Sequence, residues 1–538
     1  WRYIQVSCIF TWNWYNLRVL IFNIRKMKNK FIYLAILAAG FASCEPEFEN
    51  EVGANYTSGD ADFTSYVAVG NSLTAGYMDG TVSRGGQANS FPNLLSQQFA
   101  LVGGGAFTQP SYADDVNNLG GLMLGGIPIG STRLVIDASE GRPENIAGTS
   151  TIEVSNLQAT AYNNMGVPGA KSFHLVAPGY GNIAGVALGQ SNPYFVRHAT
   201  SPSATVLGDA MLKTPTFFTN WIGANDVLSY ATNGGAQSDG VTPAADHNLT
   251  GNMNPATYGG NDITNATVFA SVYSTIVTTL TSGGAKGVVA TVPSVTSIPY
   301  FTTVPFAPVS DAALNANPQV ALLTQLYQFL AVATNGRIAP LNLTDGVSNP
   351  VLINDADLTD LSAQITLFAN GSGNPLLIAN ATTLGALYGR ARQTTSADLI
   401  VLPASSVIGT TSANPAPFNI QGVTQPLANR WVLTANEKLK VANATASYNA
   451  AIVSIANAND LAVADMNAIM NQLVTGLRIE DGTIYTANYF SSATASSVLF
   501  SLDGVHPNAK GYAVITNEII KVINRHYNAN IPFVYASS

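Results

Sequence analysis

The sequence predicts an α/β fold built around a parallel sheet, and three observations support this. Short apolar runs rich in valine and isoleucine alternate with longer helical patterns, as in chains whose helices connect parallel strands. The chain has 538 residues, which is long enough for a large core. Hydrophobic residues make up 47% and charged residues only 10%, so most of the chain is expected to fold. Right-handed crossovers should place helices on both faces of the sheet.

Five apolar runs are expected to form the strands of this sheet, and four helical patterns are expected to cover it. The strands are predicted at residues 65–70, 161–167, 214–223, 286–294 and 460–467. The helices are predicted at residues 90–100, 265–282, 434–457 and 509–527. The segment 301–430 is far longer than a crossover needs. We therefore expect it to be an insertion over the sheet edge or the active site, not a separate domain.

The N-terminal region has the pattern of an export signal. Met27 opens the sequence "MKNKFIYLAILAAGFASC", in which lysines precede an apolar stretch and small residues. We interpret residues 1–26 as translated upstream sequence and residues 27–43 as a lipoprotein signal peptide. The apolar stretch is shorter than the roughly 20 residues that a membrane-spanning helix needs. The letters "FASC" resemble the lipobox of bacterial lipoproteins, which implies a lipid on Cys44.

Residues 44–61 begin with an acidic run and are expected to form a tether. This run resembles the acidic signal of surface-exposed lipoproteins of the Bacteroidetes type, and a plain flexible linker is the alternative. The expected localisation is that of an exported lipoprotein, anchored to the outer membrane through Cys44 or exposed at the cell surface. The alternative is a signal peptide cut elsewhere, with Cys44 as a bystander. Cys8, the only other cysteine, lies in the upstream segment.

Charge and residue spacing argue against several classes of function. The net charge is -8, and no stripe of lysine and arginine is available to bind nucleic acid. The sequence "NDADLTD" (354–360) lacks the glycine and the distal glutamate of a calcium-binding loop, so a solvated turn is favoured. Four histidines are scattered without the spacing of a zinc site; they are His174, His198, His247 and His526. No metal and no cofactor is expected.

Polar residues that directly follow the predicted strands are the candidates for a functional site, because loops at the carboxyl ends of parallel strands converge on one crevice. Ser72, Gly169 and Asn225 follow the first three strands, and Asp503 and His506 precede the last helix. A serine attacks an ester when an imidazole takes its proton and a carboxylate orients that imidazole. Glycine and asparagine N–H groups can bind the resulting oxyanion. Taken singly, Ser72 could instead cap the next helix, and the other residues could belong to ordinary turns.

Four motifs resemble the conserved blocks of the SGNH hydrolase family, also called GDSL esterases and lipases. They are "GNSLTAGY", "GVPGAKS", "GAND" and "DGVHPN", in this order, and we assign residues 62–300 and 431–530 to such a domain. The resemblance implies a three-layer α/β/α, flavodoxin-like sandwich with a five-stranded parallel sheet. It implies that Ser72 is the nucleophile, His506 the general base and Asp503 the acid that orients it. It further implies an oxyanion hole formed by the Ser72 backbone N–H, Gly169 and Asn225.

One position departs from the family pattern, because Asn71 stands where the family has aspartate. Asparagine can still accept a hydrogen bond through its carbonyl oxygen, so we expect the turn before Ser72 to be kept. The expected function is a serine esterase or lipase, for which we expect the apolar insertion to favour acyl chains and to help select the ester. The alternatives are a carbohydrate acetylesterase of the same family and a non-catalytic surface lipoprotein that binds glycan or lipid.

Overall fold

The computed structural model describes residues 55–535, except 138, 140 and 492–496. The expectations for the upstream segment, the signal peptide, Cys44 and most of the tether fall on residues 1–54 and therefore lie outside the described residues. Within the described part of the chain, no helix combines the length and the apolar character that a membrane span requires.

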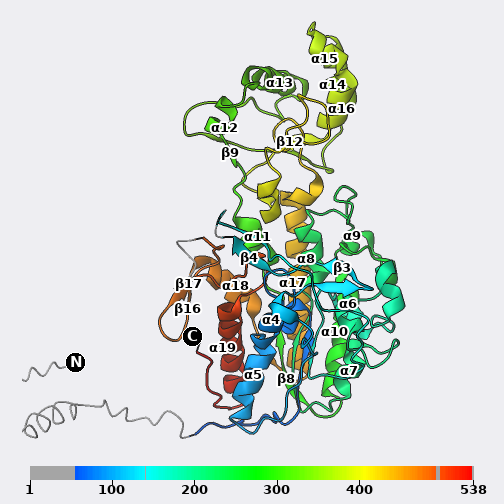
Figure 1. Ribbon diagram of the computed structural model, residues 1–538, viewed down its shortest axis with the longest axis vertical. Helices are drawn as coiled ribbons and strands as arrows, with labels where there is room; N and C mark the ends of the chain where they lie inside the picture. Colours follow the sequence, from blue (N-terminus) through cyan, green and yellow to red (C-terminus); the bar gives the residue numbers. More distant parts are fainter. Residues whose placement is uncertain (1–54, 138, 140, 492–496, 536–538) are drawn as a thin grey trace, which may run out of the picture. The chain divides into compact units, whose positions relative to one another are not determined.

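A five-stranded, all-parallel sheet forms the centre of the fold, flanked by helices (Figure 1). In spatial order its strands are β6 (Asn164–Gly166), β1 (Tyr66–Gly70), β7 (Phe217–Trp221), β8 (Lys286–Ala290) and β15 (Ala462–Ala464). β1 lies between two partners, with Ala68 opposite Asn164 of β6 and Thr219 of β7. Each of the five predicted strands is therefore confirmed, and each is shorter than predicted because the pairing stops before the apolar run does.

Alternation of side chains along the strands divides the core between the two faces of the sheet. Val67 and Val69 of β1 are buried on one face, and Tyr66 and Ala68 are buried on the other. Both faces are covered by helices, as predicted. The first face is covered by α7 (Val206–Met211), α8 (Asn225–Thr232), α10 (Ala266–Thr281) and α17 (Ala435–Ala458). The second face is covered by α5 (Phe91–Ala100) and α19 (Ala509–His526).

The long covering helices begin at residues that satisfy their free N–H groups. The Asn265 side chain accepts hydrogen bonds from the first turn of α10. Thr434 and Glu437 form a capping box at the start of α17, in which each side chain accepts from the other residue's backbone N–H. The Asn508 side chain accepts from Gly511 N at 2.9 Å and fixes the start of α19. The four predicted helices are confirmed to within one or two residues because their caps are local signals.

Shorter elements surround the carboxyl ends of the strands. The helices are α3 (Ser72–Ala75), α4 (Arg84–Ala88), α6 (Pro193–Val196), α9 (His247–Thr250) and α18 (Met466–Thr475). Three antiparallel pairs also occur, namely β2 (Leu122–Leu124) with β3 (Ile127–Gly130), β4 (Leu134–Asp137) with β5 (Arg142–Asn145), and β16 (Leu477–Arg478) with β17 (Ile484–Tyr485). Only α18 among them takes up part of a predicted strand, because the run 460–467 ends in the first residues of this helix.

The insertion 301–430 forms a lobe beyond the carboxyl end of β8 (Figure 1). It is entered through α11 (Pro299–Thr302). Its helices are α12 (Asp311–Asn315), α13 (Val320–Ala333), α14 (Ser362–Asn370), α15 (Pro375–Ala379) and α16 (Ala381–Tyr388). Its short strands are β9 (Val309–Ser310), β10 (Ser348–Asn349), β11 (Leu352–Asn354), β12 (Ala391–Gln393) and β13 (Leu399–Ile400), the last of which pairs with β14 (Val432–Leu433). The lobe has two hydrophobic clusters of its own.

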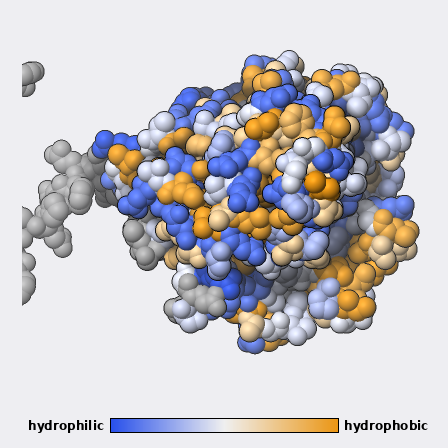
Figure 2. All heavy atoms as spheres, turned by 90° about the horizontal axis from the view of Figure 1, so that it is seen from above, coloured by the Kyte–Doolittle hydropathy of each residue, from blue (hydrophilic) through white to orange (hydrophobic). Residues whose placement is uncertain are grey.

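The base of the lobe is continuous with the main core. Val351 and Ile400 belong to the same cluster as the first face of the sheet. Arg392 binds Asp398 through two hydrogen bonds of 2.7 and 2.8 Å, and Asp398 also accepts from the first N–H of α17. The far end is more exposed and carries Leu367, which is 72% exposed. Figure 2, which looks onto this end of the molecule, shows hydrophobic and hydrophilic side chains interspersed.

Candidate active site

Ser72 lies at the carboxyl end of β1, in the first turn of the short helix α3. The cap of this helix is the neighbouring Asn71, whose Oδ1 accepts from Leu73 N at 3.1 Å. The turn that Asn71 was expected to keep is therefore present, and the Ser72 hydroxyl is not needed as a cap. A Cβ on Gly70 would lie 2.2 Å from Thr74 Oγ1, so glycine is required where the strand meets this turn. Ser72 Oγ is left available to a partner outside the helix.

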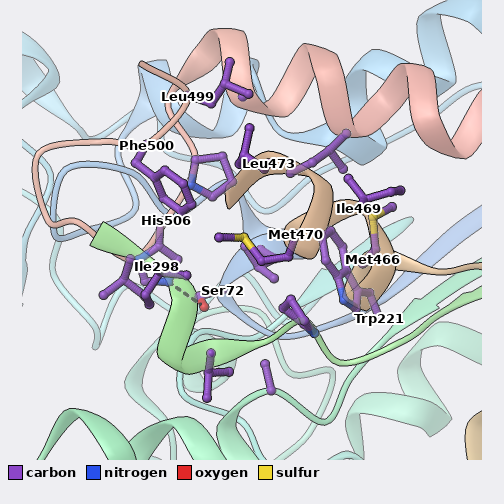
Figure 3. Close-up of a pocket in the computed structure, with 18 of the residues that line it drawn as sticks. Ser72, Trp221, Ile298, Met466, Ile469, Met470, Leu473, Leu499, Phe500 and His506 are labelled. Carbon is purple, nitrogen blue, oxygen red and sulfur yellow. Dashed lines mark hydrogen bonds between the residues drawn. The ribbon is translucent and has the colours of Figure 1, made fainter. Parts of the chain in front are cut away.

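That partner is His506, which lies 434 residues farther along the chain. Ser72 Oγ and His506 Nε2 are 2.9 Å apart (Figure 3). His506 Nδ1 is 2.8 Å from Asp503 Oδ2. With its proton on Nδ1, the ring donates to the carboxylate and accepts from the serine hydroxyl. The side chains of Asp503 and His506 are each 13% exposed. The structure thus brings the three predicted residues into one chain of hydrogen bonds.

Asp503 is held by five donors, which fixes its carboxylate and stabilises its charge. Besides the imidazole, Oδ1 accepts from Ser501 Oγ at 3.0 Å and from the backbone N–H groups of Val505 and His506 at 2.8 Å each. Oδ2 also accepts from Gly80 N at 3.1 Å. Burial acts to raise the pKa of Asp503, but the adjacent imidazole and these hydrogen bonds hold it below its ordinary value. The carboxylate is therefore kept ionised beside the ring.

The turn around Asp79 joins the serine loop to the loop that carries Asp503. Asp79 N donates to Ser501 Oγ at 3.1 Å, and Asp79 Oδ1 accepts from Leu502 N at 3.0 Å. Asp79 has a positive φ of 55°, which aspartate tolerates better than most residues. Sequence reasoning missed this residue. The dipeptide Asp79-Gly80 is a turn signal, but only the fold shows that this turn contacts residues more than 400 positions away.

Two aromatic residues support the imidazole and the serine turn. The ring of Tyr77 lies against His506 with centroids 4.5 Å apart, and the Tyr77 hydroxyl donates to Gly80 O. Tyr512 OH donates to Tyr77 O at 2.7 Å. Burial raises the pKa of Tyr77, so its hydroxyl stays a neutral donor. Neither tyrosine was identified from the sequence, although Tyr77 ends the first motif.

Gly169 and Asn225 lie shortly after the ends of the strands on either side of β1. Gly169 has a φ of 79°, in the region that favours glycine. Asn225 is the first residue of α8, and its Nδ2 donates one hydrogen to Ala170 O at 3.0 Å. That bond orients the amide and leaves its second hydrogen for another acceptor. No acceptor within the described residues is found for the backbone N–H of Ser72 or Gly169, so three N–H donors remain at this edge of the sheet.

The second and third motifs are joined by a buried hydrogen-bond pair. Asp226 accepts from Ser172 N and from Ser172 Oγ, both at 2.8 Å. Burial raises the pKa of Asp226, although these hydrogen bonds and the nearby Lys171 act to lower it. Burial also lowers the pKa of Lys171 to about 8; its ammonium donates to Asp262 O at 2.6 Å. The loops that carry Gly169 and Asn225 are therefore fixed to each other directly behind the donors.

An apolar pocket opens beside Ser72 and His506. Its empty space amounts to about 870 Å³, including the part that is open to solvent. Figure 3 shows Ile298, Met470 and Phe500 around the Ser72–His506 pair. None of the lining residues belongs to 301–430, so the apolar wall beside Ser72 is not part of the insertion. The wall comes from α18 and the segment before α19, because these elements lie at the end of the sheet.

The remaining charged candidates are engaged elsewhere. In "NDADLTD", Asp355 binds Arg392 at 2.7 Å and Asp360 binds Ser362, so these carboxylates have separate partners. His247 Nε2 is 2.9 Å from Asp262 Oδ2, in a buried pair away from the pocket. Across the described ranges, no group of three His, Cys, Asp or Glu side chains is placed to hold a metal ion.

Comparisons of this chain with models of known families, with curated proteins and with solved structures found no match.

Proposed function

We propose that this protein is a serine hydrolase that cleaves carboxylic esters through an acyl-enzyme, on the three-layer α/β/α, flavodoxin-like fold of the SGNH hydrolases. The observation that carries the proposal is the His506 ring, which lies 2.9 Å from Ser72 Oγ through one nitrogen and 2.8 Å from Asp503 through the other. A serine hydroxyl becomes a nucleophile when such a base can take its proton.

Acylation starts with attack of Ser72 Oγ on the ester carbonyl carbon while His506 Nε2 takes the hydroxyl proton. The imidazolium that forms is stabilised by Asp503, which stays ionised. The carbonyl oxygen becomes an oxyanion, for which the N–H groups of Ser72 and Gly169 and the free hydrogen of Asn225 Nδ2 are the donors. Donors of this kind act on the charge of the tetrahedral intermediate more than on the ground state.

The intermediate then collapses, and the bond between the carbonyl carbon and the alcohol oxygen breaks. The departing alcohol takes the proton from His506 Nε2, and the acyl group remains on Ser72 Oγ. A water molecule gives a proton to Nε2 and attacks the acyl carbon. The second collapse releases the carboxylic acid and returns the proton to Ser72. The sum is one ester and one water converted to one acid and one alcohol.

The site of action is proposed from the N-terminal pattern. With a lipid on Cys44 the hydrolase would be held at a bacterial outer membrane, close to ester substrates with apolar groups. Metabolic labelling of the full chain with a palmitate analogue tests the anchor. Label is expected in the wild type and not in Cys44→Ala, and equal label in both would contradict the anchor without affecting the hydrolase.

A fluorophosphonate probe tests the enzyme directly, because it bonds covalently to an activated serine. The wild-type protein is expected to be labelled and to hydrolyse a p-nitrophenyl ester, and Ser72→Ala and His506→Ala are expected to lose both. Ser96→Ala, on α5 and outside the site, is the matched control and should be labelled like the wild type. A wild-type protein that melts cooperatively but is neither labelled nor active would overturn the proposal.

A further inference from the structure

The pocket beside Ser72 has a polar end and a long apolar part. Ser72, Asn225 and His506 lie at the polar end. No Asp, Glu, Lys or Arg side chain is among the residues that line it. The apolar part gains free energy from apolar groups removed from water and has no charged side chain to bind the hydroxyl groups of a sugar.

Helix α18 forms one wall of this pocket with a regular stripe of side chains. Met466, Ile469, Met470 and Leu473 follow the i, i+3, i+4, i+7 spacing of one helix face and all line the pocket. The helix starts directly after β15, where Asp465 Oδ1 accepts from Ala468 N at 3.0 Å. The stripe runs over eight residues, and the seven steps between its ends give a rise of about 10 Å, which is the scale of a medium-length acyl chain.

The facing wall is part of the loop that carries the base. Leu499, Phe500 and Val505 line the pocket and flank His506 in sequence. The loop is closed by Ser501 N, which donates to His506 O at 2.7 Å. Figure 3 shows Phe500 beside His506, with Met466 and Trp221 farther along the pocket. A chain entering this space from the carbonyl at Ser72 therefore passes between α18 and the loop of the base.

We infer that this pocket binds the acyl chain of the ester, that the preferred chain is of medium length, and that the side chains of the α18 stripe, Met470 among them, set that length. The inference rests on the proposed function and adds the substrate class. The alcohol half must leave and be replaced by water before deacylation, whereas the acyl half stays bonded to Ser72. The buried, apolar side of the site suits the half that stays. Methionine adapts its shape to the chain at little cost.

A series of p-nitrophenyl esters from acetyl to palmitoyl tests the inference with the full-length protein. We expect kcat/KM to rise about fourfold for each methylene buried, to reach its maximum between hexanoyl and decanoyl and to fall for palmitoyl. Met470→Trp should shift the maximum to shorter chains and lower the decanoyl-to-acetyl ratio by more than about tenfold, which corresponds to about two buried methylenes. Met470→Ala should shift the maximum to longer chains.

Val474→Ala is the matched control, since Val474 lies on the same helix but is half exposed and does not line the pocket. Its chain-length profile should equal that of the wild type. A wild-type maximum at acetyl, or Met470 variants with an unchanged profile, would overturn the inference. A length preference among alkyl acetates in place of acyl esters would contradict the assignment to the acyl half.

Binding of decanoate to Ser72→Ala, measured by calorimetry, separates this inference from the proposed function because it needs no turnover. Decanoate should bind at least tenfold more tightly than acetate, and Met470→Trp in the Ser72→Ala background should weaken it. Equal affinity for the two acids would overturn the inference even in an active esterase. Tight decanoate binding by a protein that hydrolyses no ester would contradict the proposed function and support the pocket.

Discussion

The active site has a polar part and an apolar part on either side of Ser72, and different interactions hold the two parts in place. On one side stand hydrogen bonds: Asp503 accepts from five donors, and Asn225 is oriented by a bond to Ala170 O. On the other side, packing between apolar side chains of α18 and the loop before α19 shapes the pocket. Hydrogen bonds fix directions and packing fixes volumes. The first side should therefore determine the rate of the reaction, and the second should determine which ester reacts.

Substitution of Asn225 by alanine tests the polar side with the largest expected effect. The variant loses one oxyanion donor, which is worth about 10²–10³ in kcat in comparable sites. KM should change little, because the donor acts on the tetrahedral intermediate. Steady-state kinetics on a short-chain ester measures both. Asn233→Ala, at the end of the same helix, is the control, and a loss confined to KM would show that Asn225 binds the ground state instead.

We call the hydrogen bonds that join the turn at Asp79 to the loop of Asp503 the Asp79 clamp. Substitution of Asp79 tests whether this clamp acts on catalysis, and the expected effect is smaller than that of Asn225→Ala. Asp79→Ala removes the acceptor for Leu502 N–H, and a hydrogen bond of about 1–1.5 kcal/mol corresponds to roughly a tenfold loss in kcat. Asp79→Asn keeps a carbonyl oxygen in the same place and should recover most of that loss. Single-turnover acylation rates measure the effect. If both variants lower the melting temperature but leave kcat unchanged, Asp79 is a structural residue only.

Much of the fold could be predicted because its signals are local. The strands are runs of valine and isoleucine, and the helices begin at capping residues such as Asn265 and Asn508. The motifs after the strands could be connected with one another because parallel strands end at one edge of the sheet. His506 precedes α19 and follows no strand of this sheet, so its pairing with Ser72 was predicted from the chemistry of the two side chains and from the motif resemblance.

The pocket wall formed by α18 and the Asp79 clamp could not be predicted in the same way. Residues 460–467 run from β15 into α18, and Asp465, the cap at which the helix begins, was assigned to the strand. The spacing of Met466, Ile469, Met470 and Leu473 is a helical signal, but it does not show which side of the sheet the helix faces. The contact of Asp79 with Leu502 depends on how two distant loops meet, which propensities and periods do not encode.

Two buried carboxylates beside the site, Asp503 and Asp226, should respond to pH in opposite ways. The pKa of Asp503 is lowered in the folded protein, so its contribution to stability is present above the unfolded value of about 3.9 and is lost as pH falls through the folded value. The pKa of Asp226 is raised by burial, so its contribution is present below about 3.9 and is lost as pH rises through the folded value.

This pH dependence of stability is the smallest of the expected effects. It is measured as the difference in free energy of unfolding between the wild type and each asparagine variant. Between pH 3 and 7 the advantage of the wild type over Asp503→Asn should grow, whereas its advantage over Asp226→Asn should shrink. Both variants also replace an accepting oxygen by a donor, but that cost does not change with pH, so the slope isolates the charge. Slopes of the same sign would mean that hydrogen bonds from Ser172 outweigh the burial of Asp226. In that case the loops behind Gly169 and Asn225 would be held by an ionised carboxylate, as the loop of His506 is.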